Sequence, residues 1–347
     1  MSLADSRVAV GPAAREPLLS VRNLKTYFAQ DEGLVKAVDG VSFDLYPGVT
    51  LGVVGESGCG KSVTARSILR IVDRPGRIVQ GEIRFRRPGS DGAGAMVDLA
   101  ALDPNGGQMR SIRGAEIALI FQEPMSSFSP VHSVGNQIIE AIRLHQPVDR
   151  RAARDKTIEI LRRVGVSSPE ARVDQLAYQL SGGLRQRAMI AMALSCQPTL
   201  LIADEPTTAL DVTTQTQILD LMRQLQREDG MAIMLITHDL GVVAEMATDV
   251  VVMYLGRVVE QGPVDAIFHA PRHPYTRALL RSIPRLRART RERLTPIAGA
   301  VPHPYDRPRG CPFHPRCPEF RAGTCDARAP ELKLVGDRHA VSCVLYE

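Results

Sequence analysis

Gly55-Glu56-Ser57-Gly58-Cys59-Gly60-Lys61-Ser62 matches the phosphate-binding pattern G-x-x-x-x-G-K-[ST] at every fixed position. The glycines let backbone N–H groups turn inward around a phosphate, and a helix that begins at Lys61 adds positive potential at its N-terminus. The Lys61 ammonium would then reach the β- and γ-phosphates of a nucleotide, and the Ser62 hydroxyl would bind Mg²⁺. We interpret Cys59 as a small filler within the loop. All eight residues are candidate nucleotide contacts.

A second apolar segment, Leu200–Ala203, ends in the carboxylates of Asp204 and Glu205. A phosphate loop needs an acidic partner on a neighbouring strand, because Mg²⁺ and the attacking water must both be held beside the phosphates. Asp204 suits Mg²⁺ bound through water, and Glu205 suits the orientation or deprotonation of the attacking water. The alternative is a pair of acids that only cap a strand end. Beside a phosphate loop, the pair indicates a nucleotide hydrolase.

The stretch Leu180-Ser181-Gly182-Gly183-Leu184-Arg185-Gln186-Arg187 begins just over twenty residues before the acidic pair. Ser181 can cap the helix that follows, and the two glycines leave the backbone open to a second phosphate group. Alone, the stretch is also compatible with a helix start that binds no ligand. Because a phosphate loop precedes it in the chain, we favour the other interpretation: the stretch closely resembles the signature sequence of ATP-binding cassette (ABC) ATPases. It departs from that sequence at Leu184, where glutamine is common.

Two residues follow predicted strands where the ABC family carries catalytic side chains. Gln122 follows Ile117–Phe121, and the resemblance implies that it contacts the metal and the water and faces the membrane subunits. His238 follows Ile233–Thr237, and the resemblance implies a contact with the γ-phosphate. The resemblance therefore implies ATP and Mg²⁺ as ligands. The expected catalytic residues are Glu205, His238 and Gln122, and the expected Mg²⁺ site is Ser62, Gln122 and Asp204.

Further matches concern the adenine base and a dimer interface. Phe28, or failing that Tyr27, occupies the place of the aromatic residue that stacks on adenine. Asp211, in Ala209-Leu210-Asp211, resembles the loop that lies across the interface between two cassettes. The resemblance implies that a second ATPase subunit closes over the ATP, so that a monomer is nearly inactive. The residues expected to act on the partner's nucleotide are Ser181, Gly182, Gly183 and Asp211.

Short apolar runs bounded by turn residues predict strands that alternate with helical patterns. This alternation predicts an α/β fold with a largely parallel, doubly wound sheet. The Gly- and Asp-rich stretch 86–110 predicts surface hairpins and loops. Together with the resemblance, the pattern predicts a P-loop ABC ATPase cassette at 18–262 with a helical subdomain at about 123–195. A flexible tail is expected at 1–17, and a small Cys-rich extension at 263–347.

The extension carries a second resemblance. His273-Pro274-Tyr275-Thr276-Arg277 and the segment Gly310–Pro318 are similar to the ATP-binding subunits of oligopeptide and dipeptide ABC importers, the peptide/nickel subfamily. This resemblance covers most of the chain. We expect His273 and Tyr275 to be structural and to pack the extension onto the cassette.

The importer resemblance also implies a place and partners. The chain would be the ATP-hydrolysing motor for uptake of di- or oligopeptides, with nickel or another small solute left open. It would lie peripherally on the cytoplasmic face of the cell membrane, beneath two permease subunits docked between Gln122 and Ser181. A second ATPase subunit, commonly a paralogue, and an extracytoplasmic solute-binding protein would complete the importer.

Four of the six cysteines lie near the C-terminus, at Cys311, Cys317, Cys325 and Cys343. In an intracellular protein, clustered cysteines indicate metal ligands before disulfides. Four thiolates suit a [4Fe–4S] cluster or tetrahedral Zn²⁺. The spacing lacks the short C-x₂₋₄-C knuckles of most zinc sites, and members of the resembling subfamily carry a [4Fe–4S] cluster here. We therefore expect a [4Fe–4S] cluster that staples the extension, with Zn²⁺ and unliganded cysteines as alternatives.

Composition excludes several classes of protein. With 44% hydrophobic and 23% charged residues, the 347-residue chain is close to an average soluble protein and far from a disordered one. The longest charge-free apolar stretch, Ala188–Ala203, contains Pro198 and is shorter than the span of about 20 residues that a bilayer needs. Residues 1–17 mix four charges with a short apolar run, which does not fit a secretory signal. We expect a soluble, intracellular protein.

The charge distribution gives weaker signals. A net charge of +5 is too small to indicate nucleic acid binding, and we expect no nucleic acid partner. The arginine-rich run from Arg281 to Arg293 predicts a solvated connector, with contact to anionic lipid or an acidic partner as the alternative.

An ABC ATPase that acts on nucleic acid or ribosomes is the alternative function. Such proteins usually carry two cassettes, a long coiled-coil insert or a basic groove.

Overall fold

The computed structural model describes residues 16–89, 94–122, 127–208, 210–282 and 297–347. The expected flexible tail therefore lies almost entirely outside the described residues. So do Ala209 and most of the arginine-rich run.

The centre of the molecule is an eight-stranded sheet in the order β11-β12-β10-β9-β3-β8-β7-β6. Strands β9, β3, β8, β7 and β6 are parallel, and β10, β12 and β11 continue the sheet antiparallel. Every residue of β3, β7 and β8 is buried, as expected of strands covered on both faces. The α/β class is confirmed. The strands are β3 (Thr50–Val54), β6 (Ile117–Ile120), β7 (Leu200–Asp204), β8 (Ala232–Ile236), β9 (Asp249–Tyr254), β10 (Arg257–Pro263), β11 (Lys333–Gly336) and β12 (His339–Val341).

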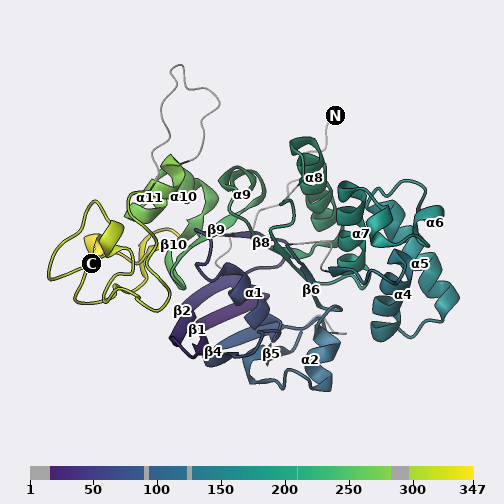
Figure 1. Cartoon of the computed structure of the whole chain (residues 1–347), viewed down its shortest axis with the longest axis horizontal. Coiled ribbons are helices and arrows are strands. Elements are labelled where there is room, and N and C mark those ends of the chain that lie inside the picture. The colour runs from purple at the N-terminus through teal and green to yellow at the C-terminus, as the bar shows by residue number, and fades with distance from the viewer. Residues whose placement is uncertain (1–15, 90–93, 123–126, 209, 283–296) are drawn as a thin grey trace, which may run out of the picture.

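A separate antiparallel sheet, ordered β2-β1-β4-β5, packs against the first through helix α1 (Lys61–Ile68), as Figure 1 shows. Its long strands extend well beyond the short apolar runs that the sequence predicts. Polar residues occupy the solvent-facing positions of an antiparallel sheet, so apolar runs mark only part of each strand. The insert at 86–110 contributes a strand and the short helix α2 (Gly107–Ile112). The strands are β1 (Leu19–Gln30), β2 (Gly33–Leu45), β4 (Gly76–Arg86) and β5 (Met96–Asp98).

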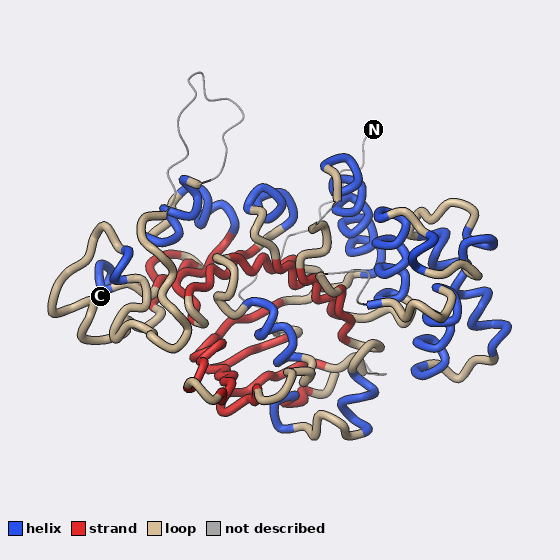
Figure 2. Tube along the Cα trace, viewed as in Figure 1, coloured by secondary structure: helices blue, strands red, loops and turns tan. Residues whose placement is uncertain are grey.

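A group of helices lies beside the β6 edge, and Figure 2 shows it apart from the strands. Each of the longer helices begins at a side chain that caps it: Ser133, Asp149 and Ser181 accept hydrogen bonds from backbone N–H groups in the first turn. These helices bury an apolar core of their own that continues into the sheet. The helices are α4 (Val134–His145), α5 (Arg150–Arg163), α6 (Pro169–Arg172) and α7 (Gly182–Leu194).

Helices α8 (Val212–Asp229) and α9 (Leu240–Met246) pack beside β8, and α10 (Val264–His269) and α11 (Pro274–Arg281) lead into the extension. Among the described residues, no helix is long and apolar enough to span a bilayer.

The extension is built into the cassette. β12 pairs with β10 through Glu260↔Val341, so two strands from the C-terminal end lengthen the central sheet. Glu260 is fully buried and accepts hydrogen bonds from the backbone N–H groups of Arg272 (2.6 Å) and His273 (2.9 Å). The rest of the extension is mainly loop (Figure 2) and shares one apolar core with β9 and β10. The domain bounds themselves stay predictions.

Candidate functional site

The phosphate loop joins β3 to α1, and three of its glycines have positive φ: Gly55 (151°), Gly58 (78°) and Gly60 (100°). A Cβ on Gly55 would lie 2.2 Å from the Met253 carbonyl oxygen, and one on Gly60 would lie 2.2 Å from that of Ala37. The loop can therefore take this course only with glycine at both positions. The result is a tight ring of backbone ahead of the helix.

The Lys61 side chain is buried inside this ring. Its Nζ donates to the carbonyl oxygens of Gly55 (2.8 Å) and Glu56 (3.1 Å). Cys59 is also buried, and burial raises the pKa of its thiol, which agrees with a filler role. An ammonium inside a ring of backbone amides is the arrangement that binds the phosphates of a nucleotide.

The predicted Mg²⁺ ligands Ser62 and Asp204 meet at the end of β7. The Ser62 hydroxyl donates to Asp204 Oδ1 at 3.0 Å. Burial raises the pKa of Asp204, the Ser62 hydrogen bond lowers it, and the charge of Glu205 raises it further, with a net upward shift. A divalent cation would relieve the cost of this buried charge. Hydroxyl and carboxylate oxygens are the ligands that Mg²⁺ prefers, so the pair fits the ion.

Glu205 lies next to this pair and is held from three sides. Its Oε2 accepts hydrogen bonds from Gln122 Nε2 (2.8 Å) and Thr208 Oγ1 (3.0 Å), and its Oε1 lies 3.1 Å from His238 Nδ1. The φ of Glu205 is +49°, a strained value for a residue with a Cβ. The structure thus brings the three predicted catalytic residues together, although they come from different strand ends.

These contacts determine the protonation state of Glu205. Burial raises its pKa, but the hydrogen bonds from His238 and Thr208 and the charges of His238 and Lys61 lower it, with a net downward shift. Glu205 is therefore an ionised carboxylate at neutral pH. Thr208 was not singled out from the sequence, because a threonine after a strand end carries no distinctive pattern.

The signature residues lie elsewhere, at the start of α7, which Figure 1 shows apart from α1. Ser181 caps the helix by accepting from the Leu184 N–H, as expected. A Cβ on Gly183 would lie 2.9 Å from Thr214 Cγ2, so the glycine lets α7 approach α8. Asp211 caps α8 through the Thr214 N–H (3.0 Å). This separation from the phosphate loop agrees with a role on a partner's nucleotide.

The structure distinguishes the two candidate adenine-stacking residues. The Tyr27 hydroxyl donates to Asp39 Oδ1 at 2.6 Å, and burial together with Asp39 raises the pKa of Tyr27 to about 12. Asp39 is also paired with Arg257 at 2.8 Å. Phe28 is half-buried opposite Val35 in β2, with no polar atom in its ring to satisfy. Tyr27 thus has a structural hydrogen bond, and Phe28 stays the candidate for stacking.

The four C-terminal cysteines line one small cavity together with His273 and Phe313. All four are free thiols, so no disulfide connects them. Burial and the neighbouring cysteines raise the pKa of Cys311 to about 11. As the side chains stand, no group of three His, Cys, Asp or Glu residues in the described part of the chain is arranged to hold a metal ion. The thiols share a cavity without forming a finished ligand set.

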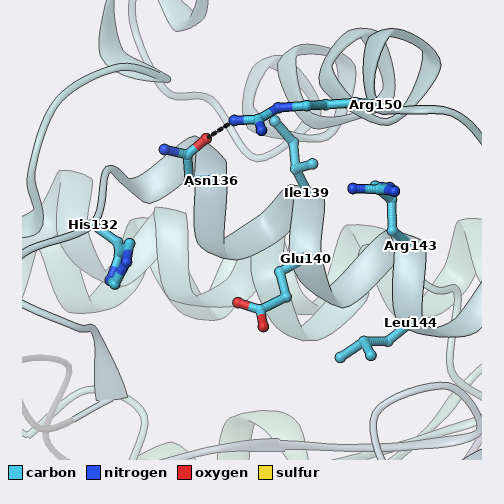
Figure 3. Close-up of a pocket in the computed structure, with 7 residues that line it drawn as sticks. All are labelled: His132, Asn136, Ile139, Glu140, Arg143, Leu144 and Arg150. Atoms are coloured by element: carbon cyan, nitrogen blue, oxygen red, sulfur yellow. Dashed lines mark hydrogen bonds between the residues drawn. The ribbon is translucent and has the colours of Figure 1, made fainter.

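A broad groove of about 510 Å³ lies on the helical part, as Figure 3 shows. Arg150 from α5 donates to Asn136 Oδ1 on α4 at 3.1 Å across one end. Leu144 at the other end is 73% exposed, and Val131, just before α4, is 76% exposed. The groove is lined by His132, Asn136, Ile139, Glu140, Arg143, Leu144 and Arg150.

Taken together, the phosphate loop, the oxygen pair at the end of β7 and the ionised Glu205 define a P-loop nucleotide hydrolase. Residues 38–208 match the ABC transporter family, and residues 259–325 match the oligopeptide/dipeptide transporter C-terminal region. The dipeptide transport ATP-binding protein DppD of Escherichia coli is 46% identical over 326 residues, which cover 94% of this chain and 96% of DppD. A Brucella ovis protein named for peptide import and ATP binding is 49% identical over 340 residues, which cover 96% of this chain and 98% of that protein.

The chain belongs to the ABC transporter family and is one of its ATP-binding subunits. Solved cassettes share its fold. MJ0796, in a dimeric structure with ADP and phosphate, has a TM-score of 0.61 at 23% identity and covers 71% of this chain and 98% of its own. The protein cbiO1 from Clostridium perfringens, part of the transporter complex cbiONQ, has a TM-score of 0.59 at 25% identity and covers 74% and 92%.

Proposed function

We propose that this chain is the ATP-hydrolysing motor subunit of an ABC importer that takes up di- or oligopeptides. The observation that carries the hydrolytic part is the ionised Glu205 carboxylate, held by Gln122 and His238 beside the Ser62–Asp204 pair. The match of residues 259–325 to the oligopeptide/dipeptide transporter C-terminal region supports the peptide cargo. The relatives named for dipeptide transport and peptide import support it further.

The geometry gives each residue a task in hydrolysis. Lys61 turns from the Gly55 and Glu56 carbonyls to the phosphates of ATP, and the loop's N–H groups bind the phosphate oxygens. When bound, Mg²⁺ neutralises developing negative charge on the phosphates, and Ser62 and Asp204 would hold it. Glu205 orients the attacking water and takes its proton, and ADP and phosphate are released.

The catalytic cycle also needs a second cassette. Ser181 and the glycines after it lie away from the chain's own phosphate loop, so they are free to contact the ATP of a partner subunit. Two cassettes would then close around ATP and separate after hydrolysis, because ATP binds the closed pair more tightly than the open one. The partner is a second ABC ATPase subunit, commonly a paralogue.

The groove of Figure 3 is the proposed docking site for the two permease subunits, at the cytoplasmic face of the membrane. It combines exposed apolar side chains with charges of both signs, which suits a short helix from a partner protein. Leu144→Asp should therefore reduce recovery of permeases in a pull-down, while ATP binding is unchanged. Leu334→Asp, at an equally exposed leucine on β11, is the matched control. Equal recovery of the permeases with both variants would show that the groove is not their docking site.

We also propose that Cys311, Cys317, Cys325 and Cys343 bind a [4Fe–4S] cluster, with Zn²⁺ as the alternative. Their position around one cavity and the absence of disulfides among them support this assignment. Iron, acid-labile sulfide and zinc should be measured on protein purified without oxygen, together with its absorption spectrum. Iron together with sulfide would support the cluster, and zinc alone would support the alternative. Protein that contains neither iron nor zinc would reject both assignments.

The experiment that tests the importer is ATP hydrolysis by the complex purified from membranes through a tag on this chain. An extracytoplasmic binding protein loaded with a short-peptide mixture should stimulate hydrolysis, and Glu205→Gln should abolish the stimulation. A complex that forms but ignores peptides would favour nickel or another small solute as cargo. If no permeases are purified together with the tagged chain, the transport role is rejected.

A further inference from the structure

Arg316, in the extension, forms a two-pronged ion pair with Glu56 in the phosphate loop. Its Nη1 donates to Glu56 Oε2 at 2.7 Å and its Nη2 donates to Glu56 Oε1 at 3.0 Å. The Arg316 side chain is only 4% exposed, and Glu56 is 23% exposed. The two residues are 260 positions apart in the sequence. A buried, bidentate pair of this kind fixes both side chains far more tightly than a surface ion pair does.

The remaining donors of Arg316 hold it rigidly in place. Its Nε donates to the Ala298 carbonyl at 3.1 Å, and its guanidinium lies 5.9 Å from the centre of the Tyr254 ring. The hydrogen bonds with Glu56 raise the pKa of Arg316, so its positive charge is permanent. Arg316 directly precedes Cys317, so the order of the cysteine region and the position of this guanidinium are linked.

A second residue of the extension holds the same point of the loop. The backbone N–H of Glu56 donates to the Tyr275 hydroxyl at 2.9 Å. Tyr275 is fully buried and its ring lies 4.7 Å from that of Tyr254 and 5.3 Å from that of Phe313. The Glu56 carbonyl in turn accepts from Lys61 at 3.1 Å. The amide, the side chain and the carbonyl of Glu56 are all fixed.

We propose that Arg316 is a positioning residue for ATP binding: through Glu56 it holds the phosphate loop open for the triphosphate and neutralises the one carboxylate within that loop. ATP carries several negative charges, and an unpaired Glu56 beside them would repel it. The extension is thus a working part of the nucleotide site as well as an attachment to the cassette. This inference concerns ATP binding and does not depend on the cargo or on a metal at the cysteines.

The test uses Arg316→Ala, Glu56→Gln and the double variant in the full-length chain, with affinity for a fluorescent ATP analogue as the first readout. Arg316→Ala should weaken binding about tenfold, because it leaves the half-buried Glu56 carboxylate without its partner. The double variant should recover most of that loss, since Glu56→Gln removes the repulsive charge. Arg277→Ala, which breaks an ion pair inside the extension with Glu319, is the matched control and should bind as the parent does.

Two further readouts separate positioning from a purely structural role. Hydrogen exchange of nucleotide-free protein should show faster exchange across residues 55–60 in Arg316→Ala, with the rest of the cassette unchanged. In the membrane complex, KM for ATP should rise while kcat stays close to that of the parent. Arg316→Lys keeps the charge but loses the fork, so its affinity should fall between those of the parent and Arg316→Ala.

Unchanged affinity in Arg316→Ala, or a double variant as weak as the single one, would show that the Glu56 charge is not what Arg316 controls. If Arg316→Ala fails to fold, Arg316→Lys decides: parental affinity and exchange in that variant would reject a positioning role.

Discussion

Glu205→Gln provides the sharpest test of the hydrolytic site. The carboxylate accepts from Gln122 and Thr208 on one oxygen and faces His238 Nδ1 with the other. A glutamine can keep this arrangement with its amide oxygen toward Gln122 and Thr208 and its NH₂ group toward a neutral His238 that accepts on Nδ1. The substitution therefore removes the basic oxygen and the negative charge, while the shape of the site is preserved.

The expected fall in the rate of ATP hydrolysis follows from the loss of general-base catalysis. General-base catalysis contributes about 10²- to 10⁴-fold to the rate, which corresponds to about 3 to 5 kcal/mol of transition-state stabilisation. We expect ATP hydrolysis to fall by that factor in the membrane complex, with affinity for a fluorescent ATP analogue within about threefold of the parent. Glu228→Gln, an exposed carboxylate on α8, is the control and should hydrolyse ATP normally.

Two results would refute this reasoning. Hydrolysis within tenfold of the parent would mean that another group activates the water. Loss of ATP binding together with hydrolysis would mean that Glu205 holds the nucleotide or the metal and is not the base. With binding kept and hydrolysis lost, the variant should instead accumulate as an ATP-bound pair of cassettes, visible as a larger species in gel filtration.

Three other predictions concern the same site. Lys61→Ala should weaken ATP binding by about two orders of magnitude in a fluorescence titration, since it removes a buried cation from the phosphate ring; retained affinity would contradict the assignment. Removal of Mg²⁺ with a chelator should stop hydrolysis, because the developing charge on the phosphates is then no longer neutralised, and hydrolysis that survives chelation would exclude a metal at Asp204. Because the pKa of Glu205 lies below its ordinary 4.5, the base is ionised at neutral pH, and the acid limb of the pH–rate profile appears only as the pH falls toward that lowered pKa. Thr208→Ala should move that acid limb of the pH–rate profile upward, and an unmoved limb would assign it to another group.

Some of the site could be predicted from sequence because its geometry is local. The phosphate loop needs glycine at Gly55 and Gly60 for reasons of backbone conformation within a few residues. Asp204 and Glu205 end a fully buried parallel strand, and the ends of such strands meet at one edge of the sheet. Sequence order therefore indicated that the acids and the loop come together.

The choice between Phe28 and Tyr27 needed the fold. The two residues are adjacent in β1 and equally aromatic, so the pattern leaves both open. Asp39 on β2 is the register partner of Lys25, two residues before Tyr27, and accepts the hydrogen bond from the Tyr27 hydroxyl, an arrangement that depends on the pairing of the two strands. Strand pairing therefore gives Tyr27 its structural hydrogen bond and leaves Phe28 as the candidate for stacking.

The sequence by itself determined the class of the protein: a P-loop hydrolase with a signature helix and a Cys-rich C-terminal region. Each of these three features is encoded by a short stretch of chain. The tertiary structure decided how the last part serves the first. It added β12 and β11 to the central sheet beside β10 and placed Arg316 against Glu56. Contacts between residues hundreds of positions apart depend on how whole elements pack, and no local periodicity or spacing records them.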